Sequence, residues 1–575
     1  MASGSAFESD SSSTQNRHNK SESADVDEYI PEPFEGNDLE LDAKQNDAGE
    51  NAADLSRHMS NAVASREISR KLTGGEKLLE KANNTNEPMP VMGGGRDYPP
   101  PIGDREIYSV TFDGPKDPEH PHNWPLKTKL ILCWCVAILA LSASVGSAIF
   151  AEAGADVKKV FHVGREVATL GTSLYVFGFA SGPVVWGPLS ELYGRFTVMI
   201  PACFIFACFS FACATGKDIQ TILLCRFFSG FFGAAPMVVA PASLADLFSA
   251  GSRGKALAVF ASVLFGGPML GPIFGGFTVK NSLLGWRWCE YFTGLVGILA
   301  LLFSIPLHKE THHPLILVSK AENLRRRTGN WAIHAPHEEF VLSINEIVTK
   351  NIARPMVMLF TEPILFFITL YNAFIYGLLY LMLTAIPMVF EGQYGWKVGE
   401  AQLPYLSMLI GILIGVVICI YFEGKFNANM IANGKACPED RLPPMMIGGV
   451  LFAIGLFWFG WTGNYPDKIH WIVPTISLAF IGCGLLAIFL PCINYIVDCY
   501  LMFAASALSG NTFLRSLFGG IFPLFSVQMF EAMHIRYAGT LLGCVALILV
   551  PVPFLFYYKG SSLRKRSKYT ISDIQ

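Results

Sequence analysis

The segment KLILCWCVAILALSASVGSAIFA, residues 129–151, decides the class of fold. After Lys129 it contains no charged side chain. A stretch of about 18 or more apolar residues with few charges is typical of an α-helix that crosses a membrane. The segment is therefore predicted to be the first membrane span of this chain.

The same pattern recurs along the sequence and predicts an all-α membrane protein. Of the 575 residues, 51% are hydrophobic and 15% are charged, whereas soluble domains usually carry about 25% charged residues. The polar stretch 308–354 divides the expected spans into six and six, and two six-helix bundles joined by a long loop are typical of secondary transporters. The twelve expected spans are residues 129–151, 168–188, 196–215, 220–244, 256–278, 288–307, 363–388, 403–422, 444–463, 470–494, 502–529 and 537–558.

The remaining segments are polar. Residues 1–100 have few aromatic side chains and no apolar periodicity, so they are predicted to be a disordered tail. Lysine and arginine gather in the loops on one side of the spans, which places both termini in the cytoplasm, although Lys158, Lys159 and Arg165 in the first outer loop run against this bias. The expected parts are a cytoplasmic tail (1–100), a pre-membrane segment (101–128), a first bundle (129–307), a central cytoplasmic loop (308–354), a second bundle (355–558) and a basic cytoplasmic tail (559–575).

Several functional classes are disfavoured. The 13 cysteines form no C-x-x-C pair and lie mostly in apolar stretches, so they are interpreted as packing residues. No phosphate-binding loop is present, so an ion gradient rather than ATP is the expected energy source. No nucleophile, cofactor or nucleic-acid motif is recognisable, which argues against an enzyme. A metal site is the less favoured interpretation of four central-loop histidines, His312, His313, His334 and His337.

The loop GPLSELYGR, residues 187–195, joins the second and third spans through a tight reversal. Glu191 and Arg195 could bond across this turn or remain solvated. Asp246 and Arg253, at the end of the fourth span, are expected close to them. The four charges are predicted to form a latch that closes the cytoplasmic side.

The fourth span contains an arginine, Arg226, within the apolar sequence ILLCRFFSGFFGAAP (222–236). An arginine at the centre of a lipid-facing helix costs about 2.5–3.5 kcal/mol on insertion scales, so it is expected to face the protein interior or water. It is either a structural arginine that reaches toward the membrane surface or a fixed charge that responds to substrate or to a titrating carboxylate.

The fifth span contains FGGPMLGPIFGG, residues 265–276. Gly267, Gly271 and Gly275 recur every four residues and form a smooth face for close approach of another helix. Pro268 and Pro272 remove backbone donors and bend the helix. Close packing alone is the alternative to a functional role.

The second half carries polar side chains within or at the ends of spans, where such groups are costly and mark candidate sites. Hydrogen bonding between helices is the alternative for the asparagines, and packing is the alternative for the phenylalanines. The candidates for a substrate cavity are Tyr175, Phe231, Tyr371, Asn372, Tyr376, Asn494, Asn511 and Arg515.

Together these motifs resemble the major facilitator superfamily, and within it the twelve-span drug:proton antiporters. GPLSELYGR is similar to the loop signature of that superfamily, with Glu191 where aspartate is more usual. IxxxRFFSG (222–230) resembles its fourth-helix motif, and GGPMLGPIFGG (266–276, ending in Gly276) resembles the fifth-helix motif of antiporters. FDGPKDPEHPHNWP (112–125), ETHHPLILVSKAENLRRR (310–327), NWAIHAPHEE (330–339) and FLPCINYIVDCYLMFAASALSGNTFLRS (489–516) are similar to fungal polyamine and multidrug exporters.

The resemblance implies the major facilitator fold and export of polyamines, azoles, mycophenolate and other xenobiotics across the plasma membrane in exchange for protons. It also implies that Arg226 couples protons and that the fifth-helix glycines set the antiport geometry. Bacterial relatives often carry an acid in the first span, whereas residues 131–150 contain none. The titrating carboxylate is then Glu290, Glu362 or Asp498, among which the sequence does not choose.

A facilitator or importer of the same fold is the nearest alternative, and dependence on a pH gradient would separate the two. A membrane sensor with a signalling tail is a second alternative, but residues 1–100 contain no recognisable docking motif. Small molecules, protons and the lipid bilayer are the expected partners. We expect a monomer without a cofactor.

Overall fold

The computed structural model describes residues 108–114, 116–307, 309–330, 332–339, 353–433, 437–565, 567 and 569. These residues belong to one compact unit, which spans Ser56–Gln575. The predicted disordered tail, residues 1–100, lies outside the described residues. The described chain is helical and contains no β-strand, with one isolated bridge between Ser109 and His334.

Eleven helices in the described residues are long and apolar enough to cross a membrane. The last one extends over 61 residues, Ala504–Arg564, whereas one crossing needs about 20. It is broken at His534, whose backbone has the non-helical angles φ 57° and ψ 158°. This helix therefore supplies two spans, and the expectation of twelve is confirmed.

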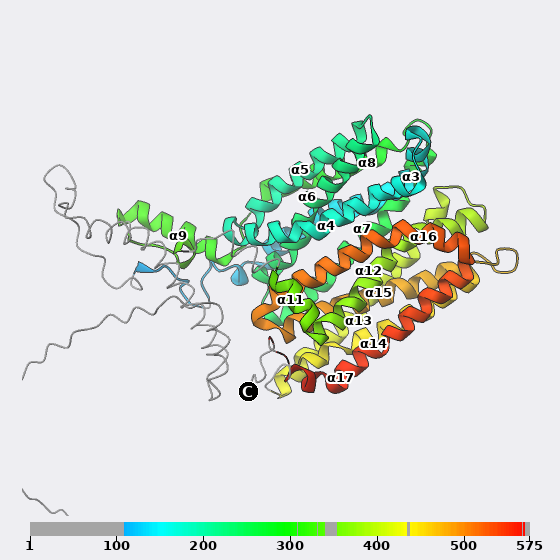
Figure 1. Cartoon of the computed structure of the whole chain (residues 1–575). Helices are drawn as coiled ribbons and strands as arrows, with labels where there is room; N and C mark the ends of the chain where they lie inside the picture. Colours follow the sequence, from blue (N-terminus) through cyan, green and yellow to red (C-terminus); the bar gives the residue numbers. More distant parts are fainter. Residues whose placement is uncertain are drawn as a thin grey trace, which may run out of the picture. The chain divides into compact units, whose positions relative to one another are not determined.

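The first half consists of six helices that begin and end at alternate faces of the molecule (Figure 1). The first of them continues ten residues beyond the expected end at 151, because Glu152 and Asp156 do not interrupt the helix. Their bounds are α3 (Leu126–Phe161), α4 (Arg165–Tyr193), α5 (Arg195–Thr215), α6 (Ile219–Leu247), α7 (Ala250–Lys280) and α8 (Arg287–Ser304).

The second half repeats this arrangement. A short helix, α11 (Arg354–Thr361), precedes it, and π-helical and 3-10 turns, η6 (Met388–Gln393) and η7 (Glu400–Gln402), follow its first span. A 3-10 turn, η8 (Pro438–Arg441), comes before the third span. The spans are α12 (Pro363–Pro387), α13 (Tyr405–Asn433), α14 (Pro443–Thr462), α15 (Ile472–Cys499), α16 (Ala504–Leu549) and its continuation α17 (Pro551–Arg564).

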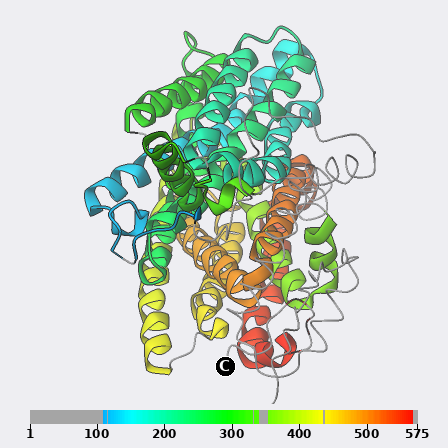
Figure 2. The same cartoon turned by 90° about the vertical axis from the view of Figure 1, so that its left-hand side faces the viewer.

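The face at which α3 begins and α17 ends is called here the terminal face, and Figure 2 looks toward it. There a soluble helix, α9 (His313–Thr328), lies against the pre-membrane segment, with a 3-10 turn, η4 (Pro336–Glu339), after it. Lys320 Nζ lies 3.5 Å from Asp117 Oδ2. Backbone N–H groups of Asp113 and Glu119 donate to Asp117 and lower the pKa of its carboxyl. The segment before the first span is thus a folded cap on the terminal face.

The two halves contact each other along two lines, α4 against α16 and α7 against α13. Within each half, the second and fourth spans approach so closely that their backbones nearly touch. A Cβ on Gly178 or Gly230 would collide with backbone atoms across the α4–α6 contact. Gly411 and Gly482 have the same role between α13 and α15. The halves are therefore built on the same close helix crossing.

Candidate functional site

Arg226 lies in the interior of the first half, joined to three other helices. Its Nε donates to Gly171 O of α4 at 3.1 Å, and its Nη1 donates to Gly146 O of α3 at 3.0 Å. The same Nη1 lies 3.0 Å from Glu290 Oε1 of α8. Both side chains of this ion pair are 0% exposed, so Arg226 does not extend to the membrane surface.

Aromatic rings enclose the Arg226–Glu290 pair. The guanidinium carbon lies 4.3 Å from the ring centre of Tyr175 and 4.8 Å from that of Phe150, which are cation–π distances. One atom on each side, Arg226 Nη2 and Glu290 Oε2, has no hydrogen-bond partner in the described part of the chain. The pair can therefore accept a further polar group or a proton without first losing an existing bond.

The other two carboxylates that the sequence offered lie elsewhere. Glu362 immediately precedes α12 at the terminal face and accepts a hydrogen bond from the Tyr500 hydroxyl at 3.3 Å. Asp498, near the end of α15, accepts from Arg441 Nε at 2.9 Å. Of the three candidates, the structure brings only Glu290 to Arg226.

At the terminal face, the predicted latch is formed in part. Arg195 Nε donates to Asp246 Oδ2 at 3.0 Å and its Nη1 donates to Ser190 at 2.9 Å. Arg253 Nη2 reaches the backbone oxygen of Ala245 at 3.4 Å. Glu191 is exposed, and no ion pair joins it to Arg195 in the residues that the structure describes. Two of the four charges thus meet directly.

Glu310, which was not singled out from the sequence, completes this corner. Its carboxylate accepts from the backbone N–H of Arg195 at 2.9 Å and of Phe196 at 3.3 Å, at the start of α5. Gly194 precedes them with φ 99°, a conformation that favours glycine. His312 lies 4.0 Å from Asp246, but burial lowers the pKa of its imidazole to about 3, so it is neutral at pH 7.

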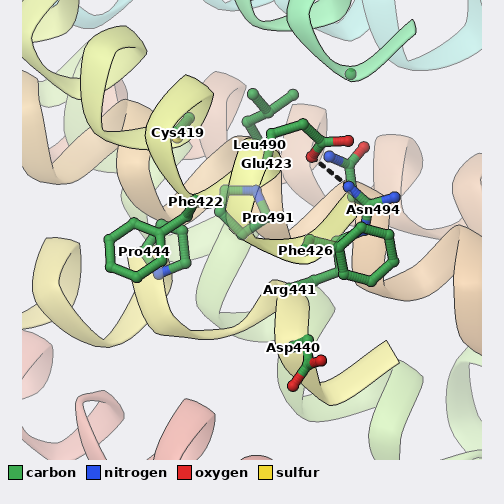
Figure 3. A pocket seen from close by; sticks show the side chains of 11 residues that line it. Cys419, Phe422, Glu423, Phe426, Asp440, Arg441, Pro444, Leu490, Pro491 and Asn494 are labelled. Carbon is green, nitrogen blue, oxygen red and sulfur yellow. Dashed lines mark hydrogen bonds and ion pairs between the residues drawn. The ribbon is translucent and has the colours of Figure 1, made fainter. Parts of the chain in front are cut away.

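The second half has a matching corner around Arg441. Its guanidinium pairs with Glu423 and with Asp498, and it stacks 3.7 Å above the ring centre of Phe426. Figure 3 shows Glu423 pointing to this guanidinium while Asp440 points away. Asn494 lines the small pocket beside it, where Gly254 of the first half faces Glu423. Asn494 is thus placed at the terminal face, not at middle depth.

The glycine motif of the fifth span packs within its own half. A Cβ on Gly271 or Gly275 would lie 2.9–3.0 Å from backbone oxygens of α3, and one on Gly267 would overlap Ser144 of the same helix. The expected close approach of a helix is therefore present, with α3 as the partner. Pro268 and Pro272 lie inside α7. Gly276 faces the second half, where a Cβ added to it would lie 2.6 Å from Gln402 Cγ.

Three cavity candidates point into the interior of a half. Tyr175 donates to Ala143 O at 2.7 Å beside Arg226. The ring centre of Phe231 lies 5.5 Å from that of Trp186. Tyr371 is fully buried against Gly449 of α14. These contacts lie within one half and follow from helical phase, which the sequence does not fix.

Two other candidates lie where the halves meet. Arg515 of α16 lies 4.8 Å from the ring centre of Tyr376 and 5.1 Å from that of Phe489. Phe265 of α7 contributes from the first half, with 4.5 Å between its ring centre and that of Phe489. We call Arg515, Tyr376, Phe489 and Phe265 the junction cluster. Asn372 donates to Asn511 at 3.0 Å nearby, between α12 and α16.

Glu152 was missed because it lies just beyond the expected end of the first span. It is half-buried on α3, and Gln402 of the second half donates to it at 2.9 Å. On the face opposite the terminal face, Arg165 and Glu531 pair at 2.7 Å and Lys280 and Glu400 at 3.1 Å, again between the halves. Polar side chains of the two halves therefore contact each other at this face.

The family model of the Major Facilitator Superfamily matches residues 134–523. The chain belongs to the major facilitator superfamily. The resemblance found in the motifs is thereby confirmed, and so is the conclusion that the chain is a multi-pass membrane transporter and not an enzyme. Transporters of this superfamily carry small molecules, so the polar residues above are candidates for transport and not for covalent catalysis.

Known fungal transporters are similar over most of the chain. The multidrug transporter FLU1 of Candida albicans is 59% identical over 517 residues, covering 90% of this chain and 85% of FLU1. The multidrug transporter TPO1_2 of Candida glabrata is 46% identical, covering 96% and 95%. Among solved structures, the xylose transporter XylE from E. coli, in a partially occluded inward-open conformation, has a TM-score of 0.53 at 16% identity, covering 75% of this chain and 98% of XylE. The last likeness concerns the fold alone.

Proposed function

We propose that this chain exports structurally diverse drugs, and polyamines among its cationic substrates, in exchange for protons across the fungal plasma membrane. Similarity to the two Candida multidrug transporters supports the substrate class. The single observation that supports proton exchange is the buried Arg226–Glu290 pair, because a carboxylate with a free oxygen beside a fixed charge can alternate between charged and neutral states.

The proposed cycle begins with a proton that reaches Glu290 from the face opposite the terminal face. We assign the terminal face to the cytoplasm because lysine and arginine are enriched there, and in the proposed cycle this proton therefore comes from outside the cell. Its addition to Glu290 cancels the attraction to Arg226, which keeps its bonds to the carbonyls of Gly146 and Gly171. The buried pair then carries one net positive charge, and this change alters the balance between the two orientations of the first half.

The polar contacts between the halves act as gates in this cycle. On the outer face they include Arg165–Glu531 and Gln402–Glu152. On the terminal face each half has its own corner, Arg195–Asp246 and Arg441–Asp498, with Glu191 and Arg253 at the edge of the first. The halves meet there where Gly254 faces Glu423, so we include both corners in the proposed inner gate. Opening one set while the other stays closed exposes the junction cluster to one side at a time, as alternating access requires.

Purified protein in sealed vesicles, with an imposed pH gradient and no ATP, tests this proposal. Labelled fluconazole and labelled spermidine are expected to accumulate, and a protonophore is expected to collapse both gradients. Glu290→Gln, which keeps the shape and removes the titration, is expected to exchange labelled for unlabelled substrate but not to accumulate it. Wild-type equilibration that ignores the gradient would identify a facilitator and would remove the proton role from Arg226.

Matched variants separate the proposed carboxylate from its rivals. Glu362→Gln and Asp498→Asn are expected to retain gradient-driven accumulation, because these carboxylates lie at the terminal face with Tyr500 and Arg441. Glu152→Gln is the informative case, since Glu152 faces the other half. Loss of accumulation in Glu152→Gln but not in Glu290→Gln would move the proton site to the first span.

A further inference from the structure

Arg515 is a charged side chain at middle depth on the line where the halves meet. It lies about 16 Å along α16 from Ala504 at the terminal face, at about 1.5 Å per residue, in a hydrocarbon core of about 30 Å. Its guanidinium contacts the ring faces of Tyr376 and Phe489. No hydrogen bond or ion pair joins it to any residue that the structure describes, and its Nε is buried without a partner.

The surrounding helices offer Arg515 no carboxylate at this depth. The segments Ala250–Lys280 and Pro363–Pro387 contain no acidic residue. The acid in α15 is Asp498, paired with Arg441, and the acid in α16 is Glu531, paired with Arg165 at the outer face. The charge of Arg515 is therefore not neutralised by the helices that carry its neighbours.

Arg226 shows how this protein surrounds a buried arginine with acceptors. That side chain has two carbonyls, one carboxylate and two rings around it, and it is fully buried. Arg515 has rings but no acceptor in the described part of the chain, and it is half-buried. A guanidinium in an apolar setting is costly unless an anion or acceptor meets it. The missing acceptor is the observation that points to a ligand.

We propose that the junction cluster binds substrates that carry an anionic group on an aromatic or apolar body, with Arg515 as the residue that receives the anion. A carboxylate or sulfonate can form two parallel hydrogen bonds with a guanidinium. Phe265, Tyr376 and Phe489 then contact the body of the ligand from both halves. This inference rests on the proposed export function and names a substrate class for it.

The same geometry predicts how strongly each class of proposed substrate depends on Arg515. A polyamine has only positive charges, and Arg515 repels it at this position, so a polyamine requires a carboxylate elsewhere, such as Glu152, which faces the other half. A neutral azole can use the rings without the charge. Anionic drugs gain both contacts, and they are expected to depend on Arg515 more than any other class.

Binding of three probes that share one ring system tests the assignment. They are 2-naphthalenesulfonate, its neutral sulfonamide, and the permanently cationic naphthylmethyl-trimethylammonium, each titrated by fluorescence anisotropy against the purified full-length protein. Arg515→Gln is expected to weaken sulfonate binding about tenfold to a hundredfold, as the loss of a charge-assisted hydrogen bond does, and to leave the sulfonamide unchanged. Arg515→Lys should lie between, because it keeps the charge but not the paired geometry.

Arg536→Gln is the matched control, since Arg536 is on the same helix but bonds to Tyr465 at the outer face. It is expected to bind all three probes as the wild type does. Equal weakening of all three probes by Arg515→Gln would make Arg515 a structural residue, and unchanged sulfonate binding would place the site elsewhere. Either result overturns the inference.

These measurements are independent of the pH gradient. Sulfonate has no proton to gain, so exchange of labelled for unlabelled sulfonate across vesicles at one pH reports on the site without coupling. Sulfonate exchange that depends on Arg515, together with spermidine accumulation that ignores an imposed gradient, would contradict proton antiport and leave the anion site standing. Gradient-driven spermidine export with no sulfonate exchange would support proton antiport and contradict the anion site.

Discussion

The two halves of this transporter are alike in their scaffolds and different in how they place charge. Both cross their second and fourth spans through facing glycines, Gly178 with Gly230 and Gly411 with Gly482. Both fix the terminal face with an arginine paired to the last acid of the fourth span of that half. The first half, however, encloses an arginine with a carboxylate in its own interior, whereas the second presents an arginine to the junction.

This difference indicates that proton binding and substrate binding use different charged residues. A pair enclosed within one bundle can change protonation without contacting the substrate, and a charge at the junction can contact the substrate without titrating. We infer that the proton is handled by the first half and the anionic substrate by the second. The scaffold they share lets either event move the bundles along the same α4–α16 and α7–α13 contacts.

The largest expected effect comes from removing the arginine of the enclosed pair. Arg226→Met leaves Glu290 buried without its cation, which for a buried pair costs about 3–5 kcal/mol of stability unless the acid takes up a proton. Gradient-driven transport should fall to background. Arg515→Met should change stability by less than about 1–2 kcal/mol, because removal of a guanidinium without an acceptor offsets the lost cation–π contacts. Thermal unfolding of the purified proteins would measure both.

The double variant Arg226→Met with Glu290→Met sharpens the same comparison. Replacing both partners of a buried pair with apolar side chains is often neutral for stability. We expect the unfolding temperature to recover while accumulation stays absent. A double variant that still accumulates substrate would show that the pair supports the fold and has no part in coupling.

The shared scaffold predicts equal effects in the two halves. Gly178→Ala and Gly411→Ala each force a Cβ into the backbone of a neighbouring helix and should each cost about 1–3 kcal/mol. Gly154→Ala and Gly424→Ala, where a Cβ meets nothing within 4 Å, are the matched controls and should be neutral or stabilising. Unequal losses at Gly178 and Gly411, measured by thermal unfolding in detergent, would mean that the crossings are not equivalent.

The terminal-face corners should differ by a smaller amount. Arg441→Gln leaves two carboxylates, Glu423 and Asp498, without their cation, whereas Arg195→Gln leaves one, Asp246. We expect the first variant to be less stable than the second by about 1 kcal/mol, measured by thermal unfolding. Arg253→Gln, which loses a weak bond to a backbone oxygen, serves as the control. The reverse order would indicate that the corner at Arg195 carries the stronger contacts.

The smallest effect is expected at Asn372 and Asn511. Hydrogen bonds between membrane helices contribute about 0.6 kcal/mol on average in double-mutant cycles, and this pair joins α12 to α16 within one half. The cycle of Asn372→Leu, Asn511→Leu and the double variant should therefore give a coupling of that size with transport retained. A loss of transport in the single variants would move the pair from the scaffold to the substrate site.

Sequence reasoning predicted the spans well because lipid demands long apolar helices, a local property. It identified Arg226 and Glu290 separately, but pairing them requires knowing that α6 and α8 face each other. For the same reason the sequence could not choose between Asp498 and Glu290 as the titrating carboxylate. Arg441, which pairs with Asp498, is one of many basic residues in the loops, and nothing local marks it as that partner. Contacts between distant segments, unlike apolar length, leave no local signature.

Helical phase limited the prediction of the cavity. Tyr371 and Tyr376 lie five residues apart, and only Tyr376 reaches the junction cluster. Glu152 escaped notice because an apolar window ends before the helix does, and α3 continues to Phe161. Glu310 opens the segment 310–327 that resembles fungal exporters, but its role had no local signal, since a loop acid that caps a helix start resembles any solvated acid until the fold brings Gly194 beside it.

The partners of Arg226 also bear on how the chain is made. Synthesis proceeds from the N-terminus, so α6 reaches the bilayer before α8 has been translated. Both carbonyls that accept from Arg226, on Gly146 and Gly171, belong to helices already inserted by then. When α6 inserts, Arg226 can therefore form two of its three hydrogen bonds with helices that are already in the membrane. Glu290 forms the third and neutralises the charge after α8 has been inserted.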